Sequence, residues 1–328
     1  MKAFEYAAPK TEAEALELLT ADDAGNTEVL AGGTDLVGLM KKMIVTPDRV
    51  INIMDVPSLQ GIEPLADGGV RIGAAVTLDE LLTNPYLEDY AAIQQAVDGI
   101  NSMQLQAQGT LGGELCQRPR CWFFRNGEGL LSADVASGDN RYHAILGNLG
   151  AAKFVSSSRI GPALTALGAK VRIAGPAEDQ VRMVDVKDFF RTPGQEGQRE
   201  TILEPKQLLT HIELPAVAGR TSSCYEVRIS EGPDTPLAAA SVVLKREAGV
   251  VRDAQVVLGQ VAPTPWSSPE ARNVLLGQPV SEELAEKAGQ AAVSVARPLS
   301  ENGYKVQLAQ VAVKRAVLLA AGLETGGF

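Results

Sequence analysis

Two glycine-containing segments are the first features of this sequence that could do chemistry. In one, Gly32 and Gly33 stand where the apolar run of residues 27–31 gives way to a helical pattern. Small side chains at such a turn let backbone N–H groups approach an anion at the positive end of a helix. The other, residues 109–113, is flanked by amides and hydroxyls, as in a backbone nest for an anion. Together the loops favour a diphosphate held from two sides, although glycine also occurs in turns for steric reasons alone.

Few other side chains in the sequence are reactive. The chain has two histidines, His143 and His211, and three cysteines, Cys116, Cys121 and Cys224. Two histidines exclude a histidine-rich zinc or non-haem iron site, and a Ser-His-Asp hydrolase would depend on one of them. Three cysteines cannot form a disulfide framework and indicate a reducing compartment or buried thiols. The glycine loops do not match the G-x-G-x-x-G fingerprint, which disfavours a Rossmann dinucleotide site.

The charge of the chain limits its partners. Its 328 residues carry a net charge of −10, and no Lys/Arg-rich run could neutralise a string of phosphates, so we expect no nucleic acid partner. No apolar stretch approaches the roughly 18 to 20 residues of a membrane span. The first residues are charged throughout, unlike a secretory signal. We therefore expect a cytoplasmic protein without a membrane span.

A short α/β unit must position the first glycine loop. Thr11, with an acid three residues later, predicts a capped helix that runs through Leu19. A strand over residues 27–31, a helix over 36–43 and a strand over 49–53 then predict a β-turn-α-β unit.

The middle of the chain alternates between strands and helices. A helix capped by Thr77 is expected, whereas residues 104–113 predict no regular element and residues 126–140 predict a long loop. The other predicted elements are a strand over 69–74, helices over 90–97, 160–167 and 185–190, and strands over 170–173 and 205–215.

The last third of the chain has a different pattern. Residues 219–223 are the best linker candidate, because they combine glycine, arginine and serine without apolar periodicity. Strands are then predicted over 237–244 and 250–261, and helices over 281–296 and 304–321. Strands first and helices last indicate an α+β module.

Several segments, in chain order, carry a resemblance that neither glycine loop could carry alone. They are residues 1–4, 31–36 (AGGTDL), 109–113 (GTLGG), 117–122 (QRPRCW), 141–144 (RYHA), 163–167 (ALTAL), 258–262 (LGQVA) and 302–305 (NGYK). This series resembles the FAD-binding medium subunit of bacterial molybdenum hydroxylases, the family of xanthine and carbon monoxide dehydrogenases. The closest likeness is to the periplasmic-type aldehyde oxidoreductases.

The resemblance implies an α+β fold of three parts. A vanillyl-alcohol-oxidase-type (PCMH) FAD-binding domain would comprise two α/β subdomains, residues 1–56 and 57–218, and a C-terminal α+β flavoprotein domain would follow at residues 222–328. FAD would lie between the two subdomains with its diphosphate on the glycine loops. The FAD-binding residues implied are Ala31, Gly32, Gly33, Thr34, Asp35, Leu36, Gly109, Thr110, Gly112, Gly113, Glu114 and Ser158. Neither histidine lies by a glycine loop, so we expect non-covalent FAD.

The resemblance also implies partners. A large molybdopterin-binding subunit would oxidise the substrate, and a small subunit with two [2Fe-2S] clusters would relay electrons to FAD. FAD would pass them to an external acceptor, which is NAD, a quinone, ferredoxin or oxygen. The isoalloxazine does the redox chemistry, so no catalytic side chain is expected in this chain. Co-export with a signal-bearing partner would be the route to the periplasm.

Some positions depart from the family pattern. Cys121 matches the first ligand of a [4Fe-4S] cluster in the nearest relatives, but residues 126–140 contain no cysteine, so we do not expect that cluster. Glu114, Arg159 and Glu226 replace other residue types, and we expect them to weaken or alter FAD binding, because a carboxylate repels a diphosphate. Two alternatives stay open: a scaffold subunit that has lost its flavin, and a stand-alone flavin oxidoreductase.

Overall fold

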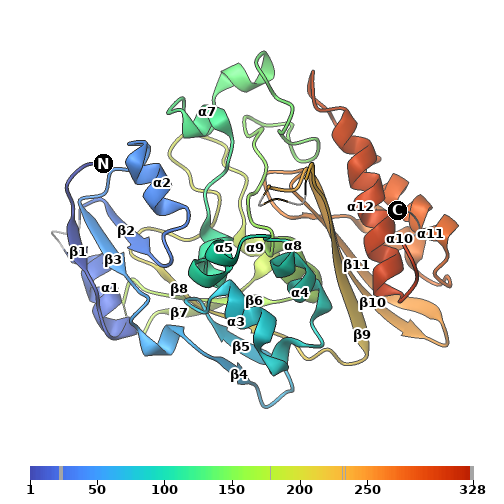
Figure 1. Ribbon diagram of the computed structural model, residues 1–328, viewed down its shortest axis with the longest axis horizontal. Helices are drawn as coiled ribbons and strands as arrows, with labels where there is room; N and C mark the ends of the chain where they lie inside the picture. Colours follow the sequence, from blue (N-terminus) through green and yellow to red (C-terminus); the bar gives the residue numbers. More distant parts are fainter. Residues whose placement is uncertain (22–24, 178, 231, 233, 326–328) are drawn as a thin grey trace.

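The computed structural model describes residues 1–21, 25–177, 179–230, 232 and 234–325. The described residues form three sheets that follow one another along the chain and lie next to one another across the molecule (Figure 1). Helices accompany each sheet, and the α+β organisation expected from the sequence is confirmed.

The N-terminal sheet is parallel, with the strand order β1-β3-β2. Its elements are β1 (Glu5–Ala7), α1 (Glu12–Thr20), β2 (Thr27–Leu30), α2 (Leu36–Lys41) and β3 (Arg49–Asn52). Thr11 caps α1 by accepting a hydrogen bond from the backbone N–H of Glu14, as predicted. Because β2 and β3 are parallel neighbours with α2 between them, the predicted β-turn-α-β unit is confirmed.

The middle of the chain forms an antiparallel sheet of order β4-β5-β8-β6-β7. The strands are β4 (Ile62–Pro64), β5 (Val70–Gly73), β6 (Lys170–Ala174), β7 (Val181–Asp185) and β8 (Leu208–Leu214). The helices are α3 (Leu78–Thr83), α4 (Ala91–Asp98), α8 (Gly161–Leu167) and α9 (Val186–Phe189). Ile72, Ile93 and Leu164, from β5, α4 and α8, are buried in one core. Burial of each such side chain contributes about 1.5–3 kcal/mol.

Residues 104–113 correct the sequence prediction. They lie in two short helices, α5 (Met103–Gln108) and α6 (Leu111–Cys116), and α7 (Trp122–Arg125) follows. Ser102 caps α5, and Thr110 caps α6 by accepting from Gly113 N. The glycine and glutamine content hid these caps from the periodicity analysis. The loop predicted over 126–140 is confirmed, with a single 3-10 turn at Ala133–Ala136.

The C-terminal sheet is antiparallel, with the order β12-β11-β10-β9. Its elements are β9 (Arg220–Val227), β10 (Ala238–Glu247), β11 (Val250–Gly259), β12 (Trp266–Ser267), α10 (Pro269–Leu275), α11 (Glu282–Ala292) and α12 (Tyr304–Ala320). The segment predicted as a linker, residues 219–223, is not irregular, because residues 220–223 belong to β9 and pair with β10. The hydroxyl of Ser223 donates to the carbonyl of Ala316 in α12, so this segment is held in the packed structure.

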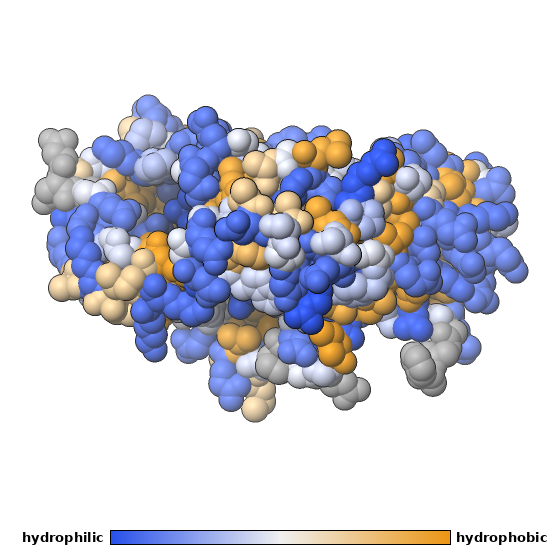
Figure 2. All heavy atoms as spheres, turned by 90° about the horizontal axis from the view of Figure 1, so that it is seen from above, coloured by the Kyte–Doolittle hydropathy of each residue, from blue (hydrophilic) through white to orange (hydrophobic). Residues whose placement is uncertain are grey.

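Polar side chains cover most of the face shown in Figure 2, where apolar residues form small, separated groups. In the part of the chain that the structure describes, no helix combines the length and apolar character needed to cross a bilayer.

Candidate functional site

The two glycine loops meet at one cavity of about 670 Å³. A Cβ atom on Gly32 would lie 1.4 Å from the backbone oxygen of Gln108, which immediately precedes the second loop. Only glycine permits this approach, so Gly32 is what allows the two loops to touch. The predicted residues that line the cavity are Ala31, Gly32, Gly33, Thr34, Asp35, Leu36, Thr110, Gly112 and Gly113.

The first glycine loop presents backbone donors at the start of α2. Gly33 has a left-handed φ of +71°, which turns the chain between β2 and α2. Among the described residues, the backbone amides of residues 32–35 find no hydrogen-bond acceptor, whereas the carbonyls of Gly33 and Asp35 accept from α2. Free N–H groups at such a turn attract an anion. The loop can therefore hold phosphate oxygens through its backbone.

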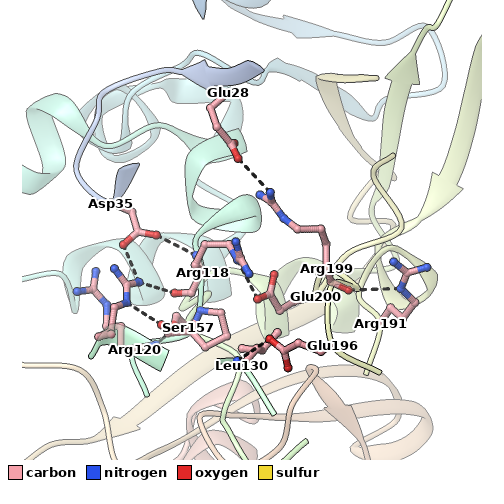
Figure 3. Close-up of polar contacts among 12 residues, drawn as sticks. Glu28, Asp35, Arg118, Arg120, Leu130, Ser157, Arg191, Glu196, Arg199 and Glu200 are labelled. Atoms are coloured by element: carbon pink, nitrogen blue, oxygen red, sulfur yellow. Dashed lines mark hydrogen bonds and ion pairs between the residues drawn. The ribbon is translucent and has the colours of Figure 1, made fainter. Parts of the chain in front are cut away.

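Asp35 has a structural role in this loop. Its carboxylate accepts from the backbone N–H of Arg118 at 2.9 Å (Figure 3). It also pairs with Arg125 Nη2 at 2.8 Å. Both side chains of the ion pair are 16% exposed. The negative charge of Asp35 is therefore balanced inside the protein and ties the first loop to the segment 118–125.

The second glycine loop differs, because its donors are already used. The backbone amides of Leu111 and Gly112 donate to Val76 and Ala74, at 2.9 Å each. The amide of Gly113 donates to the hydroxyl of Thr110 at 3.1 Å. A Cβ on Gly112 would lie 2.8 Å from that of Ala74. These glycines therefore let α6 pack closely against the chain after β5, and the loop forms a wall of the cavity instead of a second row of free amides.

The remaining predicted residues lie elsewhere. Gly109 and Glu114 line a second, smaller cavity of about 90 Å³ next to the first. Ser158 lines neither cavity, and its hydroxyl accepts from Gly161 N at 2.9 Å at the start of α8. The geometry thus brings eleven of the twelve residues to the two cavities, nine to the large one.

The opposite wall of the large cavity was missed by the sequence analysis. It comes from residues 199–201 and 203–209, a segment that carries no glycine loop. Arg118 Nε pairs with Glu200 Oε1 at 2.8 Å, and Arg199 Nη1 pairs with Glu28 Oε1 at 3.2 Å (Figure 3). The Arg199–Glu28 pair joins this wall to β2. The neighbouring arginines and glutamates of this segment were the only signal in the sequence that it could form ion pairs. The sequence does not show that Arg199 pairs with Glu28, which lies 171 positions away.

The unusual residues Glu114, Arg159 and Glu226 form one network. Arg159 Nε donates to Glu226 Oε1 at 2.9 Å, and a second bond joins Arg159 Nη2 to Glu226 Oε2. Both side chains are almost fully buried, at 8% and 5% exposure. The backbone N–H of Arg159 donates to Glu114 Oε2 at 3.0 Å, and Arg228 and Arg159 both donate to the carbonyl of Gly99. The positive charge of Arg159 and the negative charge of Glu226 therefore cancel each other.

Cys121, which immediately precedes α7, forms a neutral pair with His143. Cys121 Sγ lies 3.2 Å from His143 Nε2. Burial raises the pKa of the Cys121 thiol and lowers the pKa of His143 to about 4. In the described residues, no three histidine, cysteine or acidic side chains gather as a metal site would need.

Three of the segments that carried the family resemblance meet at a buried lysine. Lys305, 1% exposed, donates from Nζ to the carbonyls of Tyr142, His143 and Gln260 at 2.7–3.2 Å. Asn302 donates to the carbonyl of His143 as well. These polar residues therefore hold the segment 141–144 between β11 and α12, which explains their place in the pattern.

The site fits the FAD that the resemblance implies. A cavity of about 670 Å³ is within the 300–1,000 Å³ usual for cofactors and similar ligands. Free amides at its wall suit a diphosphate, and ion pairs already balance the carboxylates of Glu28, Asp35 and Glu200. Among the described residues that line the large cavity, the only other acidic side chain is Glu204. It lies on the opposite wall and is exposed to solvent.

Comparison with known proteins agrees with the geometry. The model of the FAD-binding domain in molybdopterin dehydrogenase matches residues 2–217, and that of the CO dehydrogenase flavoprotein C-terminal domain matches residues 223–320. The chain is 31% identical to the aldehyde oxidoreductase FAD-binding subunit PaoB of Escherichia coli, over 94% of this chain and 96% of that one. It is 28% identical to the carbon monoxide dehydrogenase medium chain of Hydrogenophaga pseudoflava, over 96% of both chains.

Solved structures give the same result. A Cu,Mo-CO dehydrogenase chain superposes with a TM-score of 0.77 at 26% identity, covering 98% of this chain and 99% of that one. The CO dehydrogenase of Hydrogenophaga pseudoflava gives a TM-score of 0.75 at 27% identity, covering 97% of both chains. With family models, relatives and structures in agreement over nearly the whole chain, the protein belongs to the FAD-binding medium subunits of the molybdenum hydroxylases.

Proposed function

We propose that this subunit holds one non-covalent FAD with its diphosphate on the first glycine loop, inside the large cavity. The observation that carries the proposal is the set of free backbone amides at residues 32–35, which face no protein acceptor in the described chain. The second loop, residues 109–113, and the adjacent Glu114 enclose the cofactor from the other side. The role given to Ser158 is indirect, because its hydroxyl fixes the start of α8.

Electron transfer is the reaction that this arrangement supports. FAD supplies the redox chemistry, accepting electrons singly from an iron-sulfur centre and releasing them singly or in pairs. We propose that the electrons come from a small [2Fe-2S] subunit, which receives them from a large molybdopterin subunit. They leave to an external acceptor, which is NAD, a quinone, ferredoxin or oxygen. The chain's own residues bind, orient and enclose the cofactor.

We also propose the domain limits 1–56, 57–218 and 222–328. The first strand of the last domain, β9, begins at Arg220, two residues before the proposed limit. We also propose a cytoplasmic location, with co-export beside a signal-bearing partner subunit as the route to the periplasm.

The absorption spectrum of the purified full chain tests this function. We expect a yellow protein with one FAD per chain, released intact by acid precipitation because it is not covalently bound. Colourless protein from cofactor-replete cells would refute the proposal and favour the scaffold alternative. Turnover of a small substrate by the purified chain without partners would favour the stand-alone oxidoreductase.

A further inference from the structure

The two cavities share a wall made of the first glycine loop, which is proposed to bind the diphosphate, the second glycine loop and the residue that follows α6. Thr34, Asp35, Thr110, Gly113 and Gln117 line both of them. A diphosphate lies between the two halves of a dinucleotide, so a cofactor bound at this wall extends one half to each side. One half of FAD therefore occupies the large cavity, and the other reaches the small one.

The side chains of the small cavity suit the half that changes charge. Adenosine stays neutral during the reaction, whereas the isoalloxazine becomes negative on two-electron reduction. Leu78, Ile100 and Leu105 give the small cavity apolar walls, and Thr235 bounds it from the C-terminal domain. Its volume of about 90 Å³ is too small for the whole ring system, so only an edge of the ring would enter it.

Glu114 differs from the other carboxylates that line the cavities. Glu28, Asp35 and Glu200 each pair with an arginine side chain, and Glu204 is exposed. Glu114 Oε2 instead accepts from the backbone N–H of Arg159, and Oε1 accepts from the Gln117 amide at 2.5 Å. Because both donors are neutral, no direct ion pair fixes the charge of the Glu114 carboxylate, and its protonation can change when a neighbouring charge changes.

We propose that the small cavity receives the edge of the isoalloxazine and that Glu114 takes up a proton from solvent when the flavin is reduced. This inference rests on the proposed function and goes beyond it. In the step, the flavin gains two electrons from the iron-sulfur partner, or from a chemical reductant in the assay. At a pH above the N1 pKa of the reduced ring, it also gains one proton, which leaves the ring with one negative charge. Glu114 gains a second proton, so the site takes up two electrons and two protons.

The charges around Glu114 support this role. Arg120 faces it from the segment after α6, Arg159 from the loop before α8, and Asp35 from the first glycine loop. Asp35 is neutralised by Arg125, and the side chain of Arg159 by Glu226 on β9. Burial raises the pKa of Glu114 above its ordinary 4.5, against the opposing effect of the two arginines. A negative ring beside it raises that pKa further, since like charges disfavour ionisation.

The consequence is a characteristic pH dependence of the flavin midpoint potential. Where the reduced ring carries its negative charge, one proton accompanies two electrons below the pKa of Glu114 in the oxidised protein and above its pKa in the reduced protein. Between the two values, two protons do. Each proton per electron pair is worth about 30 mV per pH unit, so the slope steepens in that interval from about 30 to about 60 mV per pH unit.

The experiment is spectroelectrochemical titration of the FAD-loaded full chain from pH 4.5 upward, in wild type and in Glu114→Gln. We expect the steep interval in the wild type and, over the same interval, a slope of about 30 mV per pH unit in Glu114→Gln. Protonation of N1 of the reduced ring steepens the slope at lower pH in both proteins alike, so only the additional interval of the wild type is assigned to Glu114. Glu114→Asp retains a carboxyl group and should retain the interval at a shifted pH, which guards against a folding defect. Glu88→Gln, an exposed residue outside both cavities, is the matched control and should behave as wild type.

Four outcomes would overturn the inference. A wild-type slope without the steep interval would show that Glu114 takes up no proton on reduction. An interval that survives in Glu114→Gln would assign the second proton to another group. Loss of the interval in Glu204→Gln alone places the ring in the large cavity. A protein that binds no FAD refutes the proposed function and this inference with it, whereas a yellow protein with an unchanged slope refutes this inference only.

Discussion

Replacing Gly32 by alanine tests whether the two glycine loops touch. The added Cβ would lie 1.4 Å from Gln108 O and 2.5 Å from Gln108 C, both backbone atoms that no rotamer change can move. Real Cβ contacts begin near 3.0 Å, so the loops must separate by about 1.6 Å, the difference between 3.0 and 1.4 Å. Overpacking in a well-packed region costs about 1–3 kcal/mol, and a clash with main chain belongs at the upper end.

The expected result is a loss of FAD affinity. If about 3 kcal/mol is needed to restore the loop geometry around the cofactor, the dissociation constant rises by about two orders of magnitude, at 1.4 kcal/mol per factor of ten. Fluorescence titration of the apoprotein with FAD measures this constant, and urea unfolding separates it from a change in global stability.

The neighbouring Gly38→Ala is the matched control. A Cβ on Gly38 meets nothing within 4 Å, and this residue lies inside α2. Alanine in a helix is favoured over glycine by about 1 kcal/mol, so this variant should keep its FAD affinity and unfold at slightly higher urea. Wild-type affinity in Gly32→Ala, within about threefold, would show that the loops do not approach each other as described.

Two further predictions concern buried charge. Arg159→Ala leaves the buried Glu226 with only the more distant Arg228, whose Nε lies 4.0 Å from Glu226 Oε2, and should cost about 3 kcal/mol in urea unfolding. Exchanging the two residues in Arg159→Glu/Glu226→Arg should recover most of that loss. Equal destabilisation of both variants would contradict an ion pair. The pKa of His143 falls from 6.5 to about 4 on folding, so the unfolded chain binds a proton in this interval that the folded chain does not. The contribution of the neutral His143 to the unfolding free energy is therefore complete above pH 6.5 and is lost as the pH falls towards 4. His143→Gln should flatten this part of the curve of unfolding free energy against pH. An unchanged curve would refute the assignment.

Local signals in the sequence were sufficient for much of the fold. Thr11 and Thr77 cap their helices because a hydroxyl and an acid three residues later satisfy backbone donors within one turn. The same local rule operates at Ser102 and Thr110, but glycine and glutamine there outweighed the caps in the prediction. Most of the segment expected as a linker, residues 219–223, is a strand, because β9 is set by pairing with β10 and not by its own composition.

The sequence by itself therefore determined the family and the first glycine loop, since an ordered series of short motifs and a strand-to-helix turn are properties of neighbouring residues. Only the tertiary structure decided what the loops do. It brought Gly32 against Gln108, used the amides of the second loop for packing, and paired Arg159 with Glu226 across 67 positions. Such contacts depend on which surfaces the packed sheets bring together, and burial then makes the pairing of charges obligatory.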